Sequence, residues 1–284
     1  MQEPNVNISA YKFVDLLEDK LVEYKHVLLG HAIELGVKGT ILLSTEGINM
    51  FISAQRETID QYLKLVETYN EFQGLPYKES VSVEQPFTRM LVRIKKEIIS
   101  MGVDSVKPAH KTAPYISAED FKRWYDEGKD MVVLDTRNDY EVQLGTFAGA
   151  QDLDIKTFRD FPTAVRQLPD ALKSKPVVTF CTGGIRCEKA ADYMNTIGFE
   201  EVYQLDGGIL KYFEKNGGSH YEGECFVFDK RVSVNSSLAE TSVIQCYACR
   251  MPLSTEKQNE AKTCFYCRGN YATGQRVANS HDAC

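Results

Sequence analysis

The spacing of hydrophobic and polar residues in the first hundred positions predicts two helices and four strands. Apolar residues recur at helical intervals up to Gly36, a residue that readily takes the left-handed conformation of a helix cap. Two short apolar runs follow, and Thr45-Glu46-Gly47 between them is typical of a hairpin turn. The expected elements are a strand over 8–14, a helix over 21–33, strands over 39–44 and 48–53, a helix over 59–69 and a strand over 87–98. This order predicts a ferredoxin-like (acylphosphatase-like) α+β sandwich in residues 1–99.

The last of these strands separates apolar and basic side chains. Met90, Val92 and Ile94 alternate with Arg89, Arg93 and Lys95, and alternate residues of a strand point to opposite faces of a sheet. A row of cations can contact the phosphates of RNA. Arg89, Arg93 and Lys95 are therefore candidate RNA-binding residues, and a merely solvated sheet face is the alternative.

Residues 115–220 alternate between helix and strand patterns, which is typical of an open parallel α/β sheet. Buried strands are expected over 131–134, 175–180 and 201–205. The preceding stretch, 100–114, contains a glycine and prolines without apolar periodicity and is expected to be a linker. Ligands of parallel sheets bind beyond the carboxyl ends of the strands, where position 181 falls.

Cys181 has the sequence surroundings of a nucleophile. It follows a buried strand and precedes a helix, and the loop between them contains Gly183 and Gly184. Glycines allow backbone N–H groups to turn inward, and together with the helix dipole these groups favour a thiolate over a thiol. The amides of Thr182, Gly183, Gly184 and Ile185 are expected to form this anion nest, and Arg186 is expected to close the loop and add positive charge.

The length of the loop favours sulfur chemistry over phosphate chemistry. Arg186 follows Cys181 by five positions, whereas cysteine phosphatases place their arginine six positions after the nucleophile and so leave room for a tetrahedral phosphate. A loop one residue shorter fits a sulfur atom carried on the cysteine. Cys187, in the first turn of the helix, is expected to pack as a small core residue, with a resolving thiol as the alternative.

Three residues after the first central strand are expected to support the loop. Asp135 stands at the end of that strand and is expected to accept hydrogen bonds inside the domain instead of acting as an acid catalyst. Arg137 and Glu141 are expected to pair with each other and to brace the loop from outside.

Residues 221–284 contain four cysteines with the spacing of a metal site. Two C-x2-C pairs, Cys246 with Cys249 and Cys264 with Cys267, are separated by 14 residues. This array is typical of structural zinc, and redox-active pairs are the alternative. The segment is expected to be a metal-held cap on the central domain, with an RNA-binding knuckle as the alternative. The sequence indicates no role for Cys225 or Cys284.

Composition and motifs limit which cellular compartment and which cofactors we expect for this chain. The chain has 284 residues, a formal charge of −7 and eight cysteines, and we expect neither a signal peptide nor a membrane-spanning segment. A soluble cytoplasmic protein is expected, in which cysteines serve catalysis or metal binding instead of disulfides. No flavin or nicotinamide fingerprint is present, and the five histidines form no evident iron triad.

The central region resembles the rhodanese domain of sulfurtransferases. Residues 135–141 followed by 145–150 resemble two rhodanese motifs, with Thr146 and Phe147 in place of the usual His-Ile. Residues 181–186 resemble the six-residue persulfide loop, and 205–209 resemble the closing Leu-x-Gly-Gly motif.

The chain as a whole resembles the rhodanese-domain tRNA uridine hydroxylases, through these motifs and residues 39–49, 84–90 and 223–229. The resemblance implies oxygen-dependent 5-hydroxylation of the wobble uridine of tRNA, with dioxygen as co-substrate, a persulfide on Cys181 and a sulfur donor as partner. The residues alone indicate a sulfur-handling loop beside a basic face. A thiosulfate or persulfide sulfurtransferase and a non-enzymatic RNA-binding adaptor are therefore the alternatives, and the oligomeric state is not indicated.

Overall fold

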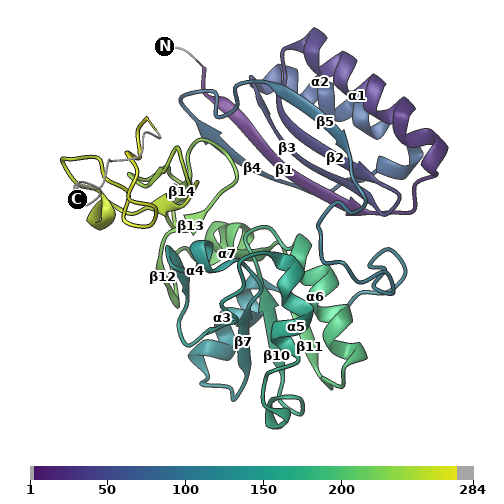
Figure 1. Ribbon diagram of the computed structural model, residues 1–284. Helices are drawn as coiled ribbons and strands as arrows, with labels where there is room; N and C mark the ends of the chain where they lie inside the picture. The colour runs from purple at the N-terminus through teal and green to yellow at the C-terminus, as the bar shows by residue number, and fades with distance from the viewer. Residues whose placement is uncertain (1–2, 274–284) are drawn as a thin grey trace, which may run out of the picture.

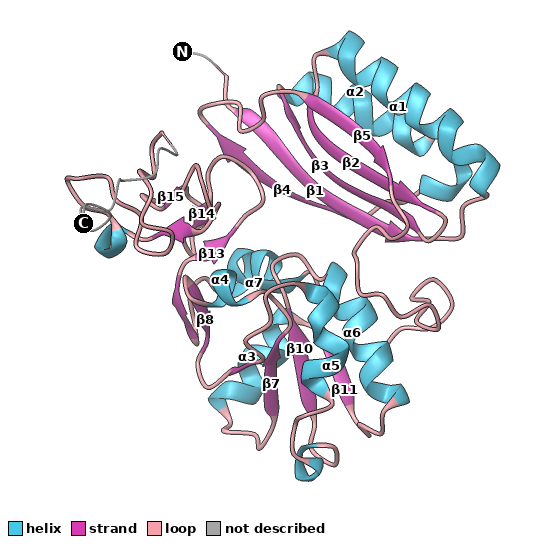
Figure 2. Ribbon diagram, in the orientation of Figure 1, coloured by secondary structure: helices cyan, strands magenta, loops and turns pink. Residues whose placement is uncertain are grey.

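An amino-terminal sheet and a central sheet lie one above the other, and the carboxyl-terminal segment lies beside both (Figure 1). The computed structural model describes residues 3–273. Helices cover one face of the amino-terminal sheet, whereas they lie on both sides of the central sheet (Figure 2). The uncovered face of the upper sheet is turned toward the central domain, so the two domains meet across it.

The amino-terminal domain is the expected α+β sandwich with one strand more than predicted. Its five strands have the order β4-β1-β3-β2-β5, and the first four of these form the ferredoxin-like arrangement. Gly36 caps the first helix with φ 79°, as its position in the sequence predicted. The elements are β1 (Asn5–Phe13), α1 (Leu21–Leu35), β2 (Lys38–Ser44), β3 (Gly47–Ala54), α2 (Arg56–Glu67), β4 (Tyr77–Ser82) and β5 (Met90–Ile94).

The strand that completes the ferredoxin-like order is β4, and the assignment of this role to 87–98 was wrong. β4 pairs with β1, whereas β5 runs parallel to β2 at the opposite edge of the sheet. β4 is an edge strand in which only Ser82 is buried. A strand without a buried face lacks the apolar alternation by which strands are recognised, so the pattern passed it over.

The two faces of the amino-terminal sheet have different neighbours. Ile8 and Ala10 of β1 are buried in the core beneath the helices, whereas the intervening Ser9 and Tyr11 belong to the opposite face. The helices use part of the predicted apolar pattern: Leu28 is fully buried, but Ile33 is 65% exposed. The core therefore lies on one side of the sheet, and polar and aromatic side chains lie on the other.

The central domain is built on an all-parallel sheet with the order β6-β11-β10-β7-β9. The three predicted strands are confirmed to within one or two residues at their ends, because buried parallel strands are continuous apolar runs. Ser117 caps α3, its Oγ accepting from the N–H of Asp120 at 3.0 Å. The elements are β6 (Tyr115–Ile116), α3 (Ala118–Asp126), β7 (Val132–Asp135), α4 (Asp139–Val142), β8 (Gly145–Phe147), β9 (Gln151–Asp152), α5 (Phe161–Val165), β10 (Val177–Phe180), α6 (Ile185–Thr196), β11 (Val202–Leu205) and α7 (Gly208–Asn216).

The stretch between the two domains contains neither helix nor strand over 100–114, yet it is packed. Met101, Val106 and Ala113 are buried in the core of the central domain. Their spacing follows no helical or strand period, which is why the sequence showed no apolar periodicity there. The connection is thus fixed along the central domain.

The carboxyl-terminal segment contains short two-stranded ladders. It begins with β12 (Tyr221–Gly223), which pairs with β8 of the central domain. Two further ladders join β13 (Cys225–Phe226) to β14 (Ser233–Val234) and β15 (Ile244–Gln245) to β16 (Pro252–Leu253). Cys284 lies outside the described residues. Within residues 3–273, no helix is both long enough and apolar enough to cross a bilayer.

Candidate functional site

Cys181 follows β10 directly, and the backbone behind it turns sharply into α6. Gly184, with φ 98°, precedes the first residue of that helix, and its N–H donates to Cys181 Sγ at 3.1 Å. The amide of Arg186 also hydrogen-bonds to the Cys181 side chain. Of the amides predicted to form an anion nest, Gly184 donates to the sulfur, and the amide of Arg186, which was not among them, is the second donor.

The surroundings of Cys181 favour its thiolate. Burial opposes ionisation of this fully buried thiol, but a hydrogen bond from Cys187, the charge of Arg186 and the two loop amides outweigh it. Together they lower the pKa of Cys181 well below the ordinary value of a thiol. These surroundings therefore favour the thiolate form of Cys181 at neutral pH.

The other cysteines near the site are held as thiols. Burial and the adjacent Cys181 thiolate raise the pKa of Cys187 well above its ordinary value, and Thr136 Oγ1 lies 3.7 Å from its sulfur. Cys187 is buried in the helix as predicted, yet it also contacts Cys181. Burial raises the pKa of Cys225 to about 12, so this cysteine is an inert core residue.

The predicted pair of Arg137 and Glu141 does not form. Glu141 instead binds Arg186 with two hydrogen bonds, of 2.6 and 2.8 Å, and both side chains are buried. The two residues lie 45 positions apart, so only the fold brings them together. This pair fixes the guanidinium that adds positive charge beside Cys181.

Arg137 pairs with Asp135. Its guanidinium donates to both Asp135 oxygens and to the carbonyl of Gly145, and both charged side chains are fully buried. Thr146 also donates to Asp135 at 2.8 Å. Asp135 is therefore an internal acceptor, as predicted, and the threonine that departs from the usual motif contributes to the same network.

The closing glycine motif holds the cysteine loop from behind. The N–H groups of Ile209 and Leu210 donate to the carbonyls of Cys181 and Thr182 at 3.0 and 3.1 Å. A Cβ at Gly208 would lie 2.4 Å from the carbonyl oxygen of Cys181. Only glycine permits this approach, so the motif sets the position of the loop.

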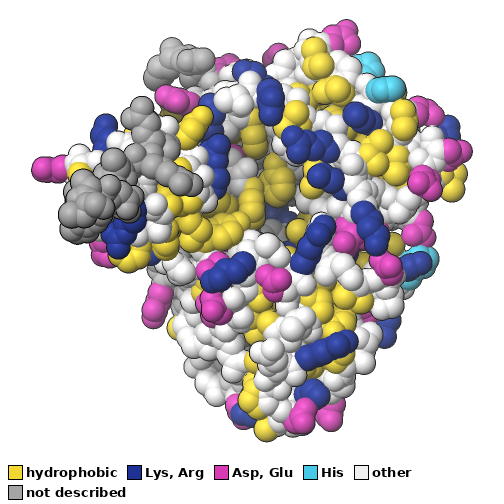
Figure 3. Space-filling view, viewed as in Figure 1, with side chains coloured by type: hydrophobic (Ala, Val, Ile, Leu, Met, Phe, Trp, Pro, Cys, Tyr) yellow, Lys and Arg dark blue, Asp and Glu magenta, His cyan; other side chains and the backbone are white. Residues whose placement is uncertain are grey.

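Cys181 lines a cleft of about 740 Å³ between the loop and the uncovered face of the amino-terminal sheet. Figure 3 shows this hollow with hydrophobic side chains inside it and Lys and Arg side chains along its edge. The sheet contributes apolar and polar residues, among them Leu42, Asn49 and Phe51, and the central domain contributes the loop and Phe158. Since both domains line it, the cleft exists only in the assembled molecule.

Of the candidate RNA-binding residues, Arg93 belongs to β5, and Arg89 and Lys95 lie directly before and after it. Leu42 lines the cleft, and its cross-strand neighbour is Arg93, so the two side chains share a face. Arg89, Arg93 and Lys95 are all exposed. Lys95 lines the cleft itself, and Arg159 lines it from the central domain.

Two charged residues of α6 tie the domains together, and the sequence analysis missed both. Lys189, 3% exposed in its side chain, bonds to Glu46 and Glu97 and to the carbonyl of Ile99, with distances of 2.8–3.0 Å. Glu188 accepts from Tyr11 of β1 at 3.3 Å. Helical spacing alone gave no signal, because a charged residue on a helix is usually solvated.

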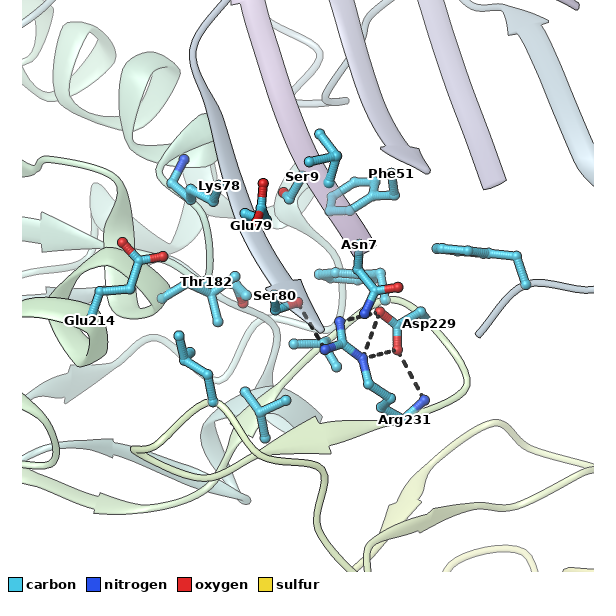
Figure 4. A pocket seen from close by; sticks show the side chains of 17 residues that line it. Asn7, Ser9, Phe51, Lys78, Glu79, Ser80, Thr182, Glu214, Asp229 and Arg231 are labelled. Carbon is cyan, nitrogen blue, oxygen red and sulfur yellow. Dashed lines mark hydrogen bonds and ion pairs between the residues drawn. The ribbon is translucent and has the colours of Figure 1, made fainter. Parts of the chain in front are cut away.

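The carboxyl-terminal segment completes the wall of the cleft with Phe228. Arg231 donates to Asp229 and also to Ser80 of β4, at 2.9 Å for the latter, and thereby anchors the segment to the amino-terminal domain. Figure 4 shows this contact beside a smaller cavity of about 40 Å³, which Thr182 and Phe51 also line.

The four cysteines of the carboxyl-terminal segment form one cluster that could bind a metal ion. Their sulfur atoms all lie within 4.8 Å of one another. The sulfur atoms of Cys246 and Cys267 are 3.8 Å apart, and those of Cys249 and Cys264 are 3.7 Å apart. Each contact joins one C-x2-C pair to the other, and a tetrahedral zinc site with bonds of about 2.3 Å separates its sulfurs by roughly 3.8 Å.

Comparison with known families matches both larger domains. A family described as "UPF0176 acylphosphatase like domain" matches residues 5–98, and one described as "Rhodanese-like domain" matches residues 117–215. Among solved structures, the rhodanese-like domain of a protein from Anabaena sp. is 25% identical with a TM-score of 0.33, covering 39% of this chain and 79% of that chain.

Curated relatives match the chain over nearly its whole length. A protein of Cupriavidus taiwanensis named "tRNA uridine(34) hydroxylase" is 48% identical, over 93% of this chain and 96% of the relative. Proteins with the same name from Cupriavidus necator and Burkholderia mallei are each 47% identical, over 93% and 89% of this chain and 97% and 87% of the relatives.

Proposed function

The chain belongs to the tRNA uridine(34) hydroxylase family, and on that premise we propose that it hydroxylates the wobble uridine of tRNA. Cys181 is the reactive group of this proposal and carries sulfur as a persulfide. The observation that carries it is the cleft, in which a stabilised thiolate faces a sheet that bears exposed cations. A free-standing sulfurtransferase would need no such second wall.

Each residue of the site has a separate role in the proposed reaction. The Cys181 thiolate attacks the outer sulfur of the donor, the donor's S–S bond breaks, and the rest of the donor leaves as sulfite or as a thiolate. The amides of Gly184 and Arg186 hold the negative charge on the transferred sulfur. Glu141 orients Arg186. Arg89, Arg93 and Lys95 contact RNA phosphates, and the target base enters the cleft.

The test is the tRNA of a strain that lacks the protein. Nucleoside mass spectrometry should find the hydroxyuridine lost, restored by the wild-type chain and not restored by Cys181→Ala. Cys225→Ala is the matched control, because this second buried cysteine has a raised pKa and lies outside the loop, and it should restore the modification. Normal hydroxyuridine in the deletion strain, or full restoration by Cys181→Ala, would refute the proposal.

The proposal also covers the source of the new oxygen atom, the sulfur donor and the cellular compartment. We expect dioxygen to supply the new oxygen atom, so label from ¹⁸O₂ should enter the nucleoside. The donor is expected to be a small thiosulfate-like or persulfide compound that fits the cleft, and the reaction is placed in the cytoplasm with its tRNA substrate. Incorporation of label from water alone would contradict the expected source of oxygen.

A plain sulfurtransferase activity is the second candidate, favoured by the five-residue spacing from Cys181 to Arg186. It predicts release of thiocyanate from thiosulfate and cyanide. Cys181→Ser should abolish this release, and an unchanged rate would remove the support for this activity.

We also propose zinc as the metal of the four-cysteine cluster. The sulfur separations match the tetrahedral geometry, and the surrounding segment has only a small apolar core. The purified protein should contain one zinc ion per chain by elemental analysis. Cys249→Ser together with Cys264→Ser should remove the metal and expose the segment to proteolysis, and metal-free wild-type protein with a resistant segment would contradict the assignment.

A further inference from the structure

An exposed phenylalanine stands beside the reactive cysteine without an assigned role. Phe228 is 45% exposed, although the burial of a large aromatic side chain is favourable. It lines the same cleft as Cys181 and Arg186, and its ring centroid lies 5.8 Å from the Arg186 guanidinium carbon. An apolar ring that is exposed in the cleft of a reactive cysteine indicates that a ligand covers the ring when it binds.

The ring is held firmly in this exposed position. Its centroid lies 5.1 Å from that of Phe226, at an interplanar angle of 83°, and 6.1 Å from that of Phe51 of β3. The adjoining Asp229 is fixed by Arg231, which reaches Ser80. Rigid aromatic side chains lose little entropy when they bind a flat ligand, so Phe228 is suited to be a platform.

Asn49 supplies a polar group in the same cleft. The side chain is 6% exposed, and its Nδ2 donates to the carbonyl of Ile98 at 3.1 Å. This bond fixes the amide, and within residues 3–273 no hydrogen bond reaches Oδ1. The buried polar atoms without a partner do not include this oxygen, so Oδ1 is open to the cleft that Asn49 lines, where it can accept a hydrogen bond from a ligand that brings an N–H group.

We propose that the cleft beside Cys181 is a slot for one extruded pyrimidine base, which stacks on Phe228 and donates its N3–H to Asn49 Oδ1. Uracil carries a proton on N3 and cytosine does not, so the slot favours uracil. An enzyme that acts on a base must take that base out of its stack, and extruded bases are held between apolar side chains and polar edges. The inference rests on the proposed function and specifies how its substrate is held.

The test compares RNA binding with and without the base. Fluorescence anisotropy would measure the affinity of an anticodon stem-loop that carries either uridine or an abasic site at the target position, at one salt concentration. Phe228→Leu should weaken binding of the uridine RNA about 5- to 150-fold, the range of one lost stacking contact, and leave the abasic RNA unaffected. Tyr77→Leu, which replaces an exposed aromatic ring of β4 outside the cleft, is the matched control and should change neither affinity.

A second comparison tests the hydrogen bond from the base N3–H to Asn49 Oδ1. An RNA with 3-methyluridine at the target position should bind wild-type protein more weakly than the uridine RNA, and Asn49→Ala should bind the two equally. Unchanged binding of the abasic RNA shows that Asn49→Ala is folded. Equal losses for uridine and abasic RNA in Phe228→Leu, a methyl penalty that persists in Asn49→Ala, or no binding of the uridine RNA would overturn the slot.

Hydroxylation is measured separately. If wild-type protein binds uridine in preference to the abasic site but forms no hydroxyuridine, the proposed function fails and the slot stands. If it forms hydroxyuridine while Phe228→Leu loses no preference for the base, the slot fails and the function stands.

Discussion

The ionisation of Cys181 depends on a neighbour that remains neutral. Cys187 donates to the Cys181 thiolate, and that thiolate in turn raises the pKa of Cys187. Two thiols in contact cannot both ionise at low cost. Cys187 was expected to pack or to resolve a persulfide, and the structure gives it a third property, because its hydrogen bond contributes to the lowered pKa of Cys181.

This pair predicts a pH dependence. Because the pKa of Cys181 is lowered, the thiolate should persist as the pH falls through neutrality and should disappear only in acid, and loading with sulfur should fall with it. The ultraviolet thiolate absorbance of wild-type protein minus that of Cys181→Ser measures this titration. Cys187→Ala should raise the midpoint by about one to two pH units, since a hydrogen bond to a charge contributes about 1.5–3 kcal/mol.

Cys225→Ala is the control for this titration and should leave the midpoint unchanged. An unaltered midpoint in Cys187→Ala would show that the loop amides and Arg186 stabilise the thiolate without help from the second cysteine.

At the scale of elements, the strands were predictable in proportion to their burial. β7, β10 and β11 were found because they are buried apolar runs, whereas β4 was missed because only Ser82 of that strand is buried. The loop of Cys181 was recognisable from its glycines and spacing. The partner of Glu141 was not, because Arg186 reaches it only after α4 and α6 have packed on the sheet.

The position of β5 leads to a prediction about how the affinity for tRNA depends on salt concentration. Arg89→Glu with Arg93→Glu should weaken tRNA binding and make the plot of log affinity against log salt shallower by roughly 1–2, because each lost phosphate contact removes about one released counterion. Lys25→Glu with Lys64→Glu makes the same charge change on the helices that cover the other face, and should alter the slope less. Filter binding over a series of salt concentrations measures both, and equal slopes for wild-type and the β5 variant would reject this strand as the phosphate-binding site.

At the scale of the whole molecule, one buried lysine joins the domains. Burial works against the charge of Glu97, but Lys189 and the amides of Met101 and Gly102 outweigh it and lower the pKa of this carboxyl. A carboxylate with a lowered pKa contributes stability above its ordinary pKa, and this stability is lost as the pH falls through the lowered value. The contact between the domains should therefore hold at neutral pH and weaken in acid.

Lys189→Met should uncouple the two domains. It leaves Glu46 and Glu97 without their cation, and breaking a buried ion pair costs about 3–5 kcal/mol. Calorimetry should show the unfolding separate into two transitions, and hydroxylation should fall more than loading of Cys181 with sulfur. Lys175→Met, which removes an exposed pair with Asp130, is the control and should change stability by less than about 1 kcal/mol. A single, unshifted transition in Lys189→Met would contradict this role.

The contact of Tyr11 with the cysteine loop limits how this protein could be rebuilt or could diverge. A Cβ at Gly184 would lie 2.9 Å from the Tyr11 hydroxyl, and that hydroxyl is bound to Glu188, four residues farther along the chain. The central domain is therefore not an interchangeable part. A chimaera that takes this domain from a free-standing sulfurtransferase would need a glycine at the position of Gly184, so that the loop clears Tyr11, and a glutamate at the position of Glu188, so that the Tyr11 hydroxyl keeps its acceptor.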